Sequence, residues 1–222
     1  MEDLENIKWL GHASFFFIDE NGNRIYYVDP FDLKGRSLEK ADLIFITHAH
    51  YDHFSPEDLS QVLADQTTII APPDILAKID LPNERKIEVS PNNSYEVKGF
   101  KFSTVPAYNT HPDRLQFHPR GNNWVGYIFE MNDKKIYHAG DTDFPPEMAE
   151  LKNDHIDVAL IPMGGKFTMD VSEAIEAANT IAAKITIPMH YKLLLGDSYK
   201  DAEDKFKREV KNSKVVILEE LK

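Results

Sequence analysis

The chain has 222 residues, nine histidines, no cysteine and a formal charge of −12. Without thiols it cannot form disulfides, cysteine zinc fingers, iron–sulfur clusters or a cysteine nucleophile, so any bound metal would need imidazole and carboxylate ligands. The acidic charge argues against a dedicated nucleic-acid or membrane-surface binder. The length predicts one domain over residues 1–222. Because the sequence shows no membrane-length apolar run and no N-terminal signal core, we expect a cytoplasmic protein.

Short apolar runs separated by turns predict a mixed α/β (α+β) fold. Strands are expected at residues 15–18, 25–28, 43–46, 67–71, 100–105, 125–131, 135–138, 157–163, 185–189 and 215–218. The first two flank the turn-rich residues 19–23, which predict a hairpin loop. Residues 43–46 are apolar throughout, which is typical of a strand that is covered on both faces.

Helices are indicated by their capping residues. Ser55 suits the N-cap of a helix, with Pro56 at its first position. Asp170 and Glu173 form a capping-box pattern before apolar residues that repeat on one helical face. A last helix is expected at residues 201–211.

Two parts of the sequence echo each other. Residues 24–27 lead to Asp29 and then to a buried strand, a polar loop and a capped helix, and residues 135–138 lead to Asp141 and the same succession. The echo predicts two related halves packed sheet to sheet, with both polar loops at one edge.

Four potential metal ligands occupy six positions directly after the buried strand 43–46: His48, His50, Asp52 and His53. Alternate residues of an extended chain face the same way, so His48 and His50 can converge on one metal. A turn then brings Asp52 and His53 back toward the same point. Burying these groups without a metal would leave several polar atoms hard to satisfy. The segment therefore predicts a metal site.

Two further candidate ligands also follow strands. Gly140 permits a sharp turn that would project Asp141, and one carboxylate can bridge two cations through its two oxygens. His190 directly follows the β-branched run at residues 185–189. With three such loops in one small domain, we interpret both residues as ligands.

Together, the segments T-H-A-H-Y-D-H, G-D-T and P-M-H-Y resemble the metallo-β-lactamase superfamily of metal-dependent hydrolases, in a compact branch similar to the ascorbate-6-phosphate lactonases. The resemblance implies a four-layer αββα sandwich with a dinuclear site along one edge. It implies that one metal is bound by His48 and His50, the other by Asp52, His53 and His190, and both by Asp141. Asp52 and Asp141 are also the candidate catalytic residues.

One position departs from the family pattern. Relatives carry the first metal's third histidine shortly after a strand, where this chain has Asn109. Asn109 could bind through its amide oxygen, or His118 or His111 could supply the ligand from the long polar loop 109–123. His118 is our first choice and His111 our second. A loosely held first metal is the other alternative.

The resemblance implies that a metal-bound hydroxide attacks an ester, lactone or phosphorylated small molecule. Zinc is the first choice for the two divalent ions, with manganese or iron as alternatives. Candidate substrate-binding residues are Asn109, Lys166, Thr168 and Tyr191. The alternatives are a nuclease or lipid phosphodiesterase, which the acidic charge disfavours, and a non-catalytic metal-binding regulatory domain. We expect a small-molecule substrate, no nucleic-acid or membrane partner, and leave a homo-oligomer open.

Overall fold

A computed structural model describes residues 4–19 and 24–221 of the chain. The chain divides into two compact units, the first comprising Met1–Val89 with Leu218–Lys222 and the second Ser90–Ile217. No helix among the described residues is long and apolar enough to cross a membrane.

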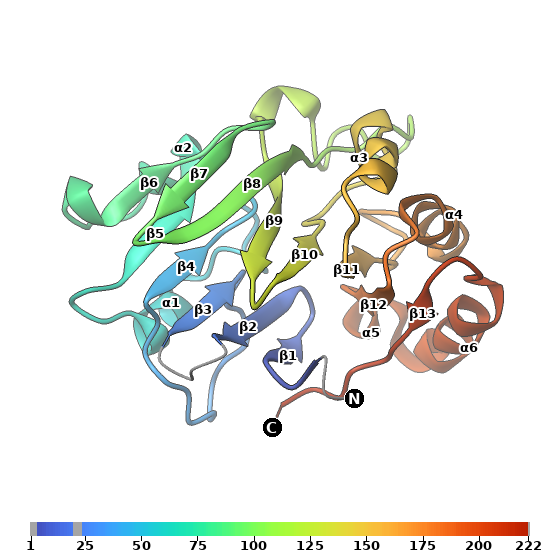
Figure 1. The fold of residues 1–222 in the computed structure, drawn as a ribbon, viewed down its shortest axis with the longest axis horizontal. Helices are drawn as coiled ribbons and strands as arrows, with labels where there is room; N and C mark the ends of the chain where they lie inside the picture. The colour runs from blue at the N-terminus through green and yellow to red at the C-terminus, as the bar shows by residue number, and fades with distance from the viewer. Residues whose placement is uncertain (1–3, 20–23, 222) are drawn as a thin grey trace. The chain divides into compact units, whose positions relative to one another are not determined.

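The first unit is built on a six-stranded sheet with the order β1-β2-β3-β4-β5-β6 (Figure 1). Its strands are β1 (Ile7–Gly11), β2 (Ser14–Ile18), β3 (Ile25–Val28), β4 (Leu43–Phe45), β5 (Thr68–Ala71) and β6 (Lys86–Glu88). Strands β1 to β3 pair antiparallel, and β3 to β6 pair parallel. The parallel strands end at one edge, so the loops that follow β3 and β4 start from the same edge of this sheet.

Two short helices cover the first sheet, α1 (Pro56–Val62) and α2 (Pro73–Leu76), and a 3₁₀ turn, η2 (Asn83–Arg85), precedes β6. The hydroxyl of Ser55 caps α1 by accepting from the backbone N–H of Asp58. Leu59 and Val62 of α1 pack with Ile44 of β4 in one buried cluster. This packing fixes both ends of the loop at residues 46–55, between β4 and α1.

The second unit is built on a seven-stranded sheet with the order β13-β12-β11-β10-β9-β8-β7. Its strands are β7 (Ser94–Val97), β8 (Phe100–Pro106), β9 (Val125–Met131), β10 (Lys134–His138), β11 (Val158–Pro162), β12 (Ile185–Met189) and β13 (Lys214–Val215). Strands β7 to β10 pair antiparallel and β10 to β13 parallel. Each sheet therefore has an antiparallel part followed by a parallel part.

The helices of the second unit are α3 (Pro146–Glu150), α4 (Val171–Ile181), α5 (Lys192–Leu195) and α6 (Tyr199–Glu209), with 3₁₀ turns η3 (Arg120–Asn122), η4 (Leu151–Asn153) and η5 (Gly196–Ser198). Helix α4 lies beside both α3 and α6 (Figure 1). It begins with the predicted capping box: the Asp170 carboxylate accepts from the N–H groups of Ser172 and Glu173, and the Glu173 carboxylate accepts from the N–H of Asp170.

The mixed α/β class with two sheets is confirmed, and so are the predicted caps of α1 and α4. The strand predicted at residues 215–218 is wrong beyond Val215, because residues 218–221 belong to the first unit, where Glu220 forms a bridge with Trp9. The predicted hairpin joins β2 and β3, but residues 20–23 of its loop lie outside the described residues. One domain over residues 1–222 stays a prediction.

Candidate metal centre

In the first unit, the residues predicted to bind metal lie beside His12 and Asp29, which the sequence analysis does not assign as ligands. We call these six residues the first cluster: His12, Asp29, His48, His50, Asp52 and His53. Asp29, His48 and His53 are buried and offer ligand atoms that lie within 4.8 Å of one another. His12, Asp52 and His53 likewise offer ligand atoms within 4.8 Å of one another.

Asp29 organises this cluster from the end of β3. One of its carboxylate oxygens accepts from the backbone N–H of Thr47 at 2.8 Å, and the other accepts from the Thr47 hydroxyl at 2.7 Å. Asp29 Oδ2 also lies 2.7 Å from Nδ1 of His53. The carboxylate accepts this hydrogen bond, so Nδ1 of His53 carries the hydrogen and Nε2 is the nitrogen that points away from Asp29.

The same chain of hydrogen bonds reaches His48. Because the Thr47 hydroxyl donates to Asp29, its oxygen accepts from Nδ1 of His48, which lies 2.9 Å away. Nε2 of His48 in turn lies 3.0 Å from Nδ1 of His50. The alternation of residues 48 and 50 thus brings these two nitrogens side by side, and their convergence on one metal stays a prediction.

Asp52 is half-buried and has its own partner in this unit. Nε2 of His12 lies 3.0 Å from Oδ2 of Asp52. His12 follows β1 with φ of 50°, and Asp29 follows β3 with φ of 46°. Aspartate and histidine are among the residues that tolerate this left-handed conformation, and strained backbone of this kind is concentrated at functional sites.

The second unit holds the second cluster, which consists of His118, Asp141 and His190. All three side chains are buried. Oδ2 of Asp141 lies 3.4 Å from Nε2 of His118 and 3.1 Å from Nε2 of His190. Two imidazole nitrogens thus lie beside one buried carboxylate. That Asp141 and His190 bind metal stays a prediction.

Separate segments bring these groups together. Asp141 follows β10 after Gly140, whose φ of 66° makes the expected turn. His190 follows β12 with φ of 57°. Gly164 accommodates that turn, because a Cβ at position 164 would lie 2.2 Å from the carbonyl oxygen of His190.

His118 and His111 occupy the same loop but differ in their surroundings. Nδ1 of His118 lies 3.2 Å from the carbonyl oxygen of Phe167, which can only accept, so Nδ1 carries the hydrogen and Nε2 is the nitrogen that faces Asp141. The His111 side chain is 48% exposed and lies 3.9 Å from Asp113. The second cluster therefore contains our first choice for the missing ligand and leaves out the second.

Asn109 is buried near His118. Its amide nitrogen donates to the carbonyl oxygens of Arg114 at 2.9 Å and Phe167 at 2.7 Å. Its Oδ1 is buried and has no hydrogen-bond partner within the described part of the chain. Phe167 O thus accepts from both Asn109 and His118, which ties the two side chains to one point.

The other predicted substrate residues lie in different settings. Thr168 is buried, and its hydroxyl has no hydrogen-bond partner among residues 4–19 and 24–221. Lys166 is exposed, with its ammonium 4.9 Å from the centre of the Phe167 ring. Tyr191 is buried, and its hydroxyl donates to Glu203 at 2.5 Å. This contact engages the Tyr191 hydroxyl inside the unit, which leaves Thr168 as the better candidate.

Sequence reasoning missed the residues that hold these clusters in place. The sequence does contain a signal for Asp29, because in the repeated pattern it holds the place that corresponds to Asp141. The sequence contains no such signal for Arg114 and Asp143, since their contacts join segments that are distant in the sequence. Burial disfavours the charged guanidinium of Arg114, but its contacts with Glu173, Asp143 and Asp170 outweigh this and raise its pKa.

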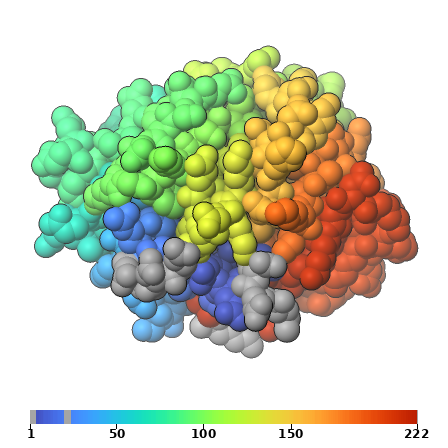
Figure 2. All heavy atoms as spheres, viewed as in Figure 1, coloured from blue at the N-terminus to red at the C-terminus, as the bar shows by residue number. Residues whose placement is uncertain are grey.

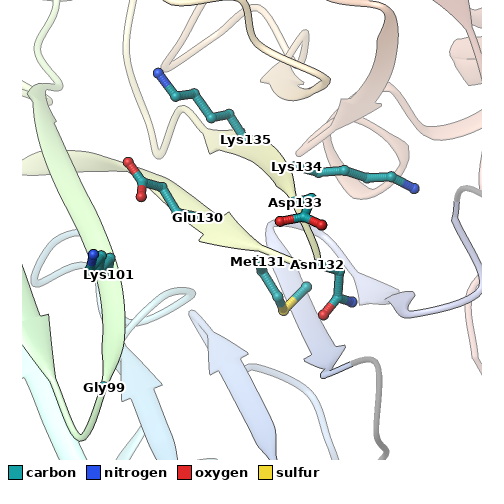
Figure 3. Close-up of a pocket in the computed structure, with 8 residues that line it drawn as sticks. All are labelled: Gly99, Lys101, Glu130, Met131, Asn132, Asp133, Lys134 and Lys135. Atoms are coloured by element: carbon teal, nitrogen blue, oxygen red, sulfur yellow. The ribbon is translucent and has the colours of Figure 1, made fainter.

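A pocket of about 440 Å³ lies elsewhere on the second unit, lined by residues 130–135 with Gly99 and Lys101. The β9–β10 hairpin that forms much of it is exposed, yellow in Figure 2. In Figure 3, Lys134 and Lys135 point in different directions. The lining also includes the carboxylates of Glu130 and Asp133, whose negative charges offset those of two lysines. Because none of the proposed ligands lines this pocket, we do not assign the reaction to it.

The chemistry of the donor sets fits a divalent metal. Both clusters consist of imidazole nitrogens and carboxylate oxygens, which suit zinc, manganese and iron. His53 and His118 each hold the hydrogen on Nδ1 through a fixed acceptor, which is the usual support of a metal-binding histidine. Both clusters could therefore hold metal ions.

Comparison with known proteins defines the class of protein. Residues 6–190 match the model of the Beta-lactamase superfamily domain. The chain is 33% identical to a candidate metal-dependent hydrolase from Parabacteroides distasonis, whose crystal structure superposes with a TM-score of 0.82 over 97% of this chain and 93% of that one. This agreement confirms the predicted fold class.

Relatives define the family within this class. A UPF0173 metal-dependent hydrolase from Alkaliphilus metalliredigens is 34% identical over 96% of both chains. Another, from Thermoplasma acidophilum, is 35% identical over 85% of this chain and 84% of its own. The chain therefore belongs to the UPF0173 family of metal-dependent hydrolases in the β-lactamase superfamily. The likeness to ascorbate-6-phosphate lactonases stays a prediction.

Proposed function

We propose that the chain hydrolyses an ester, lactone or phosphorylated small molecule with the help of two divalent cations. Zinc is the first choice of metal, with manganese or iron as alternatives. One cation would be bound by His48, His50 and His118, the other by Asp52, His53 and His190, and both by Asp141. The observation that carries this proposal is the pair of buried imidazoles that meet one carboxylate at Asp141.

The cations would supply the electrophilic part of the chemistry, because a divalent ion lowers the pKa of bound water toward roughly 7 and polarises a substrate oxygen. The chain supplies orientation. Asp29 keeps the proton of His53 on Nδ1, and the carbonyl of Phe167 does the same for His118. With Nδ1 of each ring held by an acceptor, Nε2 is the nitrogen of each ring that would bind a cation.

The proposed substrate contacts come from Asn109 and Thr168. Both side-chain oxygens are buried and lack hydrogen-bond partners in the described residues, which is costly unless another group satisfies them. Oδ1 of Asn109 can only accept, whereas the Thr168 hydroxyl can donate or accept. We therefore propose that they bind polar groups of the substrate. Lys166 and Tyr191 receive less support.

The proposal is tested by a substrate screen that compares hydrolysis by the metal-free and the metal-loaded protein. Purified protein is stripped with a chelator, reloaded separately with zinc, manganese or iron, and assayed on nitrophenyl esters, lactones, phosphomonoesters, a phosphodiester and labelled RNA. We expect hydrolysis of at least one small-molecule class that is lost on stripping and returns on reloading. Metal binding without turnover of any class would contradict the proposal and favour the regulatory alternative, and cleavage of RNA alone would favour the nuclease.

Two histidines of one loop provide a matched pair of variants. His118→Ala should reduce metal-dependent turnover by at least 10-fold, because it removes a proposed ligand. His111→Ala should leave turnover close to that of the wild type, because its side chain is half-exposed. The opposite ranking would overturn the choice of His118.

A further inference from the structure

Arg114 is a buried cation at the centre of the loop that carries His118. Its side chain is 11% exposed and contacts two carboxylates, with Nη2 2.6 Å from Glu173 and 3.0 Å from Asp143. Nη1 donates to the carbonyl oxygen of Thr168 at 2.9 Å. A planar guanidinium can satisfy several acceptors at fixed angles, which a lysine ammonium cannot do equally well.

These contacts join three separate segments of the second unit. Asp143, two residues after Asp141, also accepts from the N–H groups of Thr110 and His111, at 2.7 and 2.8 Å. Glu173 belongs to the capping box of α4. Arg114 therefore links the loop of His118 to the loop of Asp141 and to the start of α4.

The backbone of Arg114 extends the link to His118. Its carbonyl oxygen accepts from the amide of Asn109 at 2.9 Å and from the N–H of Phe117 at 3.0 Å. The N–H of Asn109 donates to the carbonyl oxygen of His118 at 2.8 Å. Displacing Arg114 would thus disturb both ends of the segment that carries His118.

We propose that Arg114 is a positioning residue of the metal centre: it fixes the loop at residues 109–118 so that Nε2 of His118 stays beside Asp141. The proposal rests on the proposed function, because His118 serves as a ligand there. A ligand on a long loop needs such support, since a flexible loop would have to be ordered each time a metal binds. The bonds of Arg114 provide that order before binding.

The experiment measures metal affinity in full-length variants by chelator competition, together with the visible spectrum of the cobalt-loaded protein. Arg114→Met removes the guanidinium, and Arg114→Lys keeps the charge but not the planar donors. Arg120→Met is the matched control, because Arg120 lies in the same region, is 71% exposed and pairs with Glu147. Each variant is made in the wild-type and in the His118→Ala background.

For Arg114→Met, we expect roughly 10- to 100-fold weaker binding of one cation and an altered cobalt spectrum, as for loss of a group that orients a ligand. Arg114→Lys should recover part of the affinity, and Arg120→Met should match the wild type. In the His118→Ala background, Arg114→Met should cause no further loss of affinity, because the residue acts through His118. If Arg114→Met does not fold, Glu173→Gln takes its place in the experiment, with a smaller expected loss of metal affinity.

Three outcomes would overturn the positioning role. The first is unchanged affinity in folded Arg114→Met or, if that variant does not fold, in Glu173→Gln. The second is an equal loss with and without His118. The third is a lower melting temperature with an unchanged cobalt spectrum, which would show a purely structural role. In each of these outcomes the wild-type protein still binds metal. A wild-type protein that bound no metal would instead contradict the proposed function itself, so the two failures can be told apart.

Discussion

Asp29 and Asp141 occupy corresponding places in the two units but have different surroundings. Each follows a strand that pairs parallel with the next one, β3 with β4 and β10 with β11. The oxygens of Asp29 accept from Thr47 and face Nδ1 of His53. Asp141 instead faces Nε2 of two histidines. The same position thus orients ligands in one unit and is proposed as a ligand in the other.

The two clusters also differ in how the chain assembles them. Most of the first cluster comes from residues 48–53, whose loop lies between β4 and α1. The second cluster takes one residue from each of three segments, and Asp143 and Arg114 link two of these, the segments of His118 and Asp141. A contiguous cluster needs little tertiary support, whereas a dispersed one depends on hydrogen bonds between loops. Substitutions should separate ligands, orienting groups and backbone supports by the size of their effects.

Asp141→Ala should have the largest effect. It removes the proposed shared ligand, so we expect loss of bound metal and of hydrolysis together, with the circular dichroism spectrum retained. Asp113→Ala is the control, because the Asp113 side chain is 89% exposed and lies in the same unit. Full activity with two metals in Asp141→Ala would contradict the assigned role.

Asp29→Asn should have an intermediate effect. The new amide nitrogen would donate to Nδ1 of His53, which drives the proton to Nε2 and blocks the lone pair needed for a metal. We expect about 10- to 100-fold weaker metal binding, measured by chelator competition. Asp32→Asn, at an exposed position three residues away, is the control. A complete loss of metal, equal to that in Asp141→Ala, would erase the distinction between the two aspartates.

Gly164→Ala should have a smaller effect that is centred on His190. The added Cβ would lie 2.2 Å from the His190 carbonyl oxygen, so the backbone must shift, at a cost of about 1–3 kcal/mol in unfolding free energy. Gly121→Ala is the control, since nothing lies within 4 Å of its Cβ position. Thermal unfolding and metal affinity report the two consequences. Equal stabilities would show that the loop absorbs the methyl group without strain.

Asp157→Asn should have the smallest effect and should depend on pH. Burial would raise the pKa of Asp157, but its contacts with Lys184 and the N–H of Lys135 outweigh burial and lower it. A carboxyl with a lower pKa in the folded state stabilises the fold above its unfolded pKa of about 3.9, and this contribution is lost as the pH falls. The variant should lose about 1 kcal/mol or less at neutral pH and show a weaker acid dependence. Parallel stability curves against pH would contradict this.

The two clusters also differ in how many of their residues can be predicted from the sequence. In the first cluster, His48, His50, Asp52 and His53 were predicted as ligands because residues that alternate after an apolar strand, and the turn that follows them, bring these side chains together by local geometry. His12 and Asp29 were not predicted as ligands. Asp141 and His190 were predicted from their places after strands, together with the family resemblance. The choice between His111 and His118 depended on whether a ring faces Phe167 O or solvent, and loop composition does not determine this. Arg114 was missed because its partners lie up to 59 positions away in the sequence.

Metal content tests the central proposal most directly. Elemental analysis of the purified protein, beside Asp141→Ala and His118→Ala, counts the ions that each chain holds. We predict two divalent ions per chain in the wild type, fewer in His118→Ala and none in Asp141→Ala. A wild-type protein without bound metal after incubation with zinc, manganese or iron would contradict the proposal, and so would an Asp141→Ala variant that retains both ions.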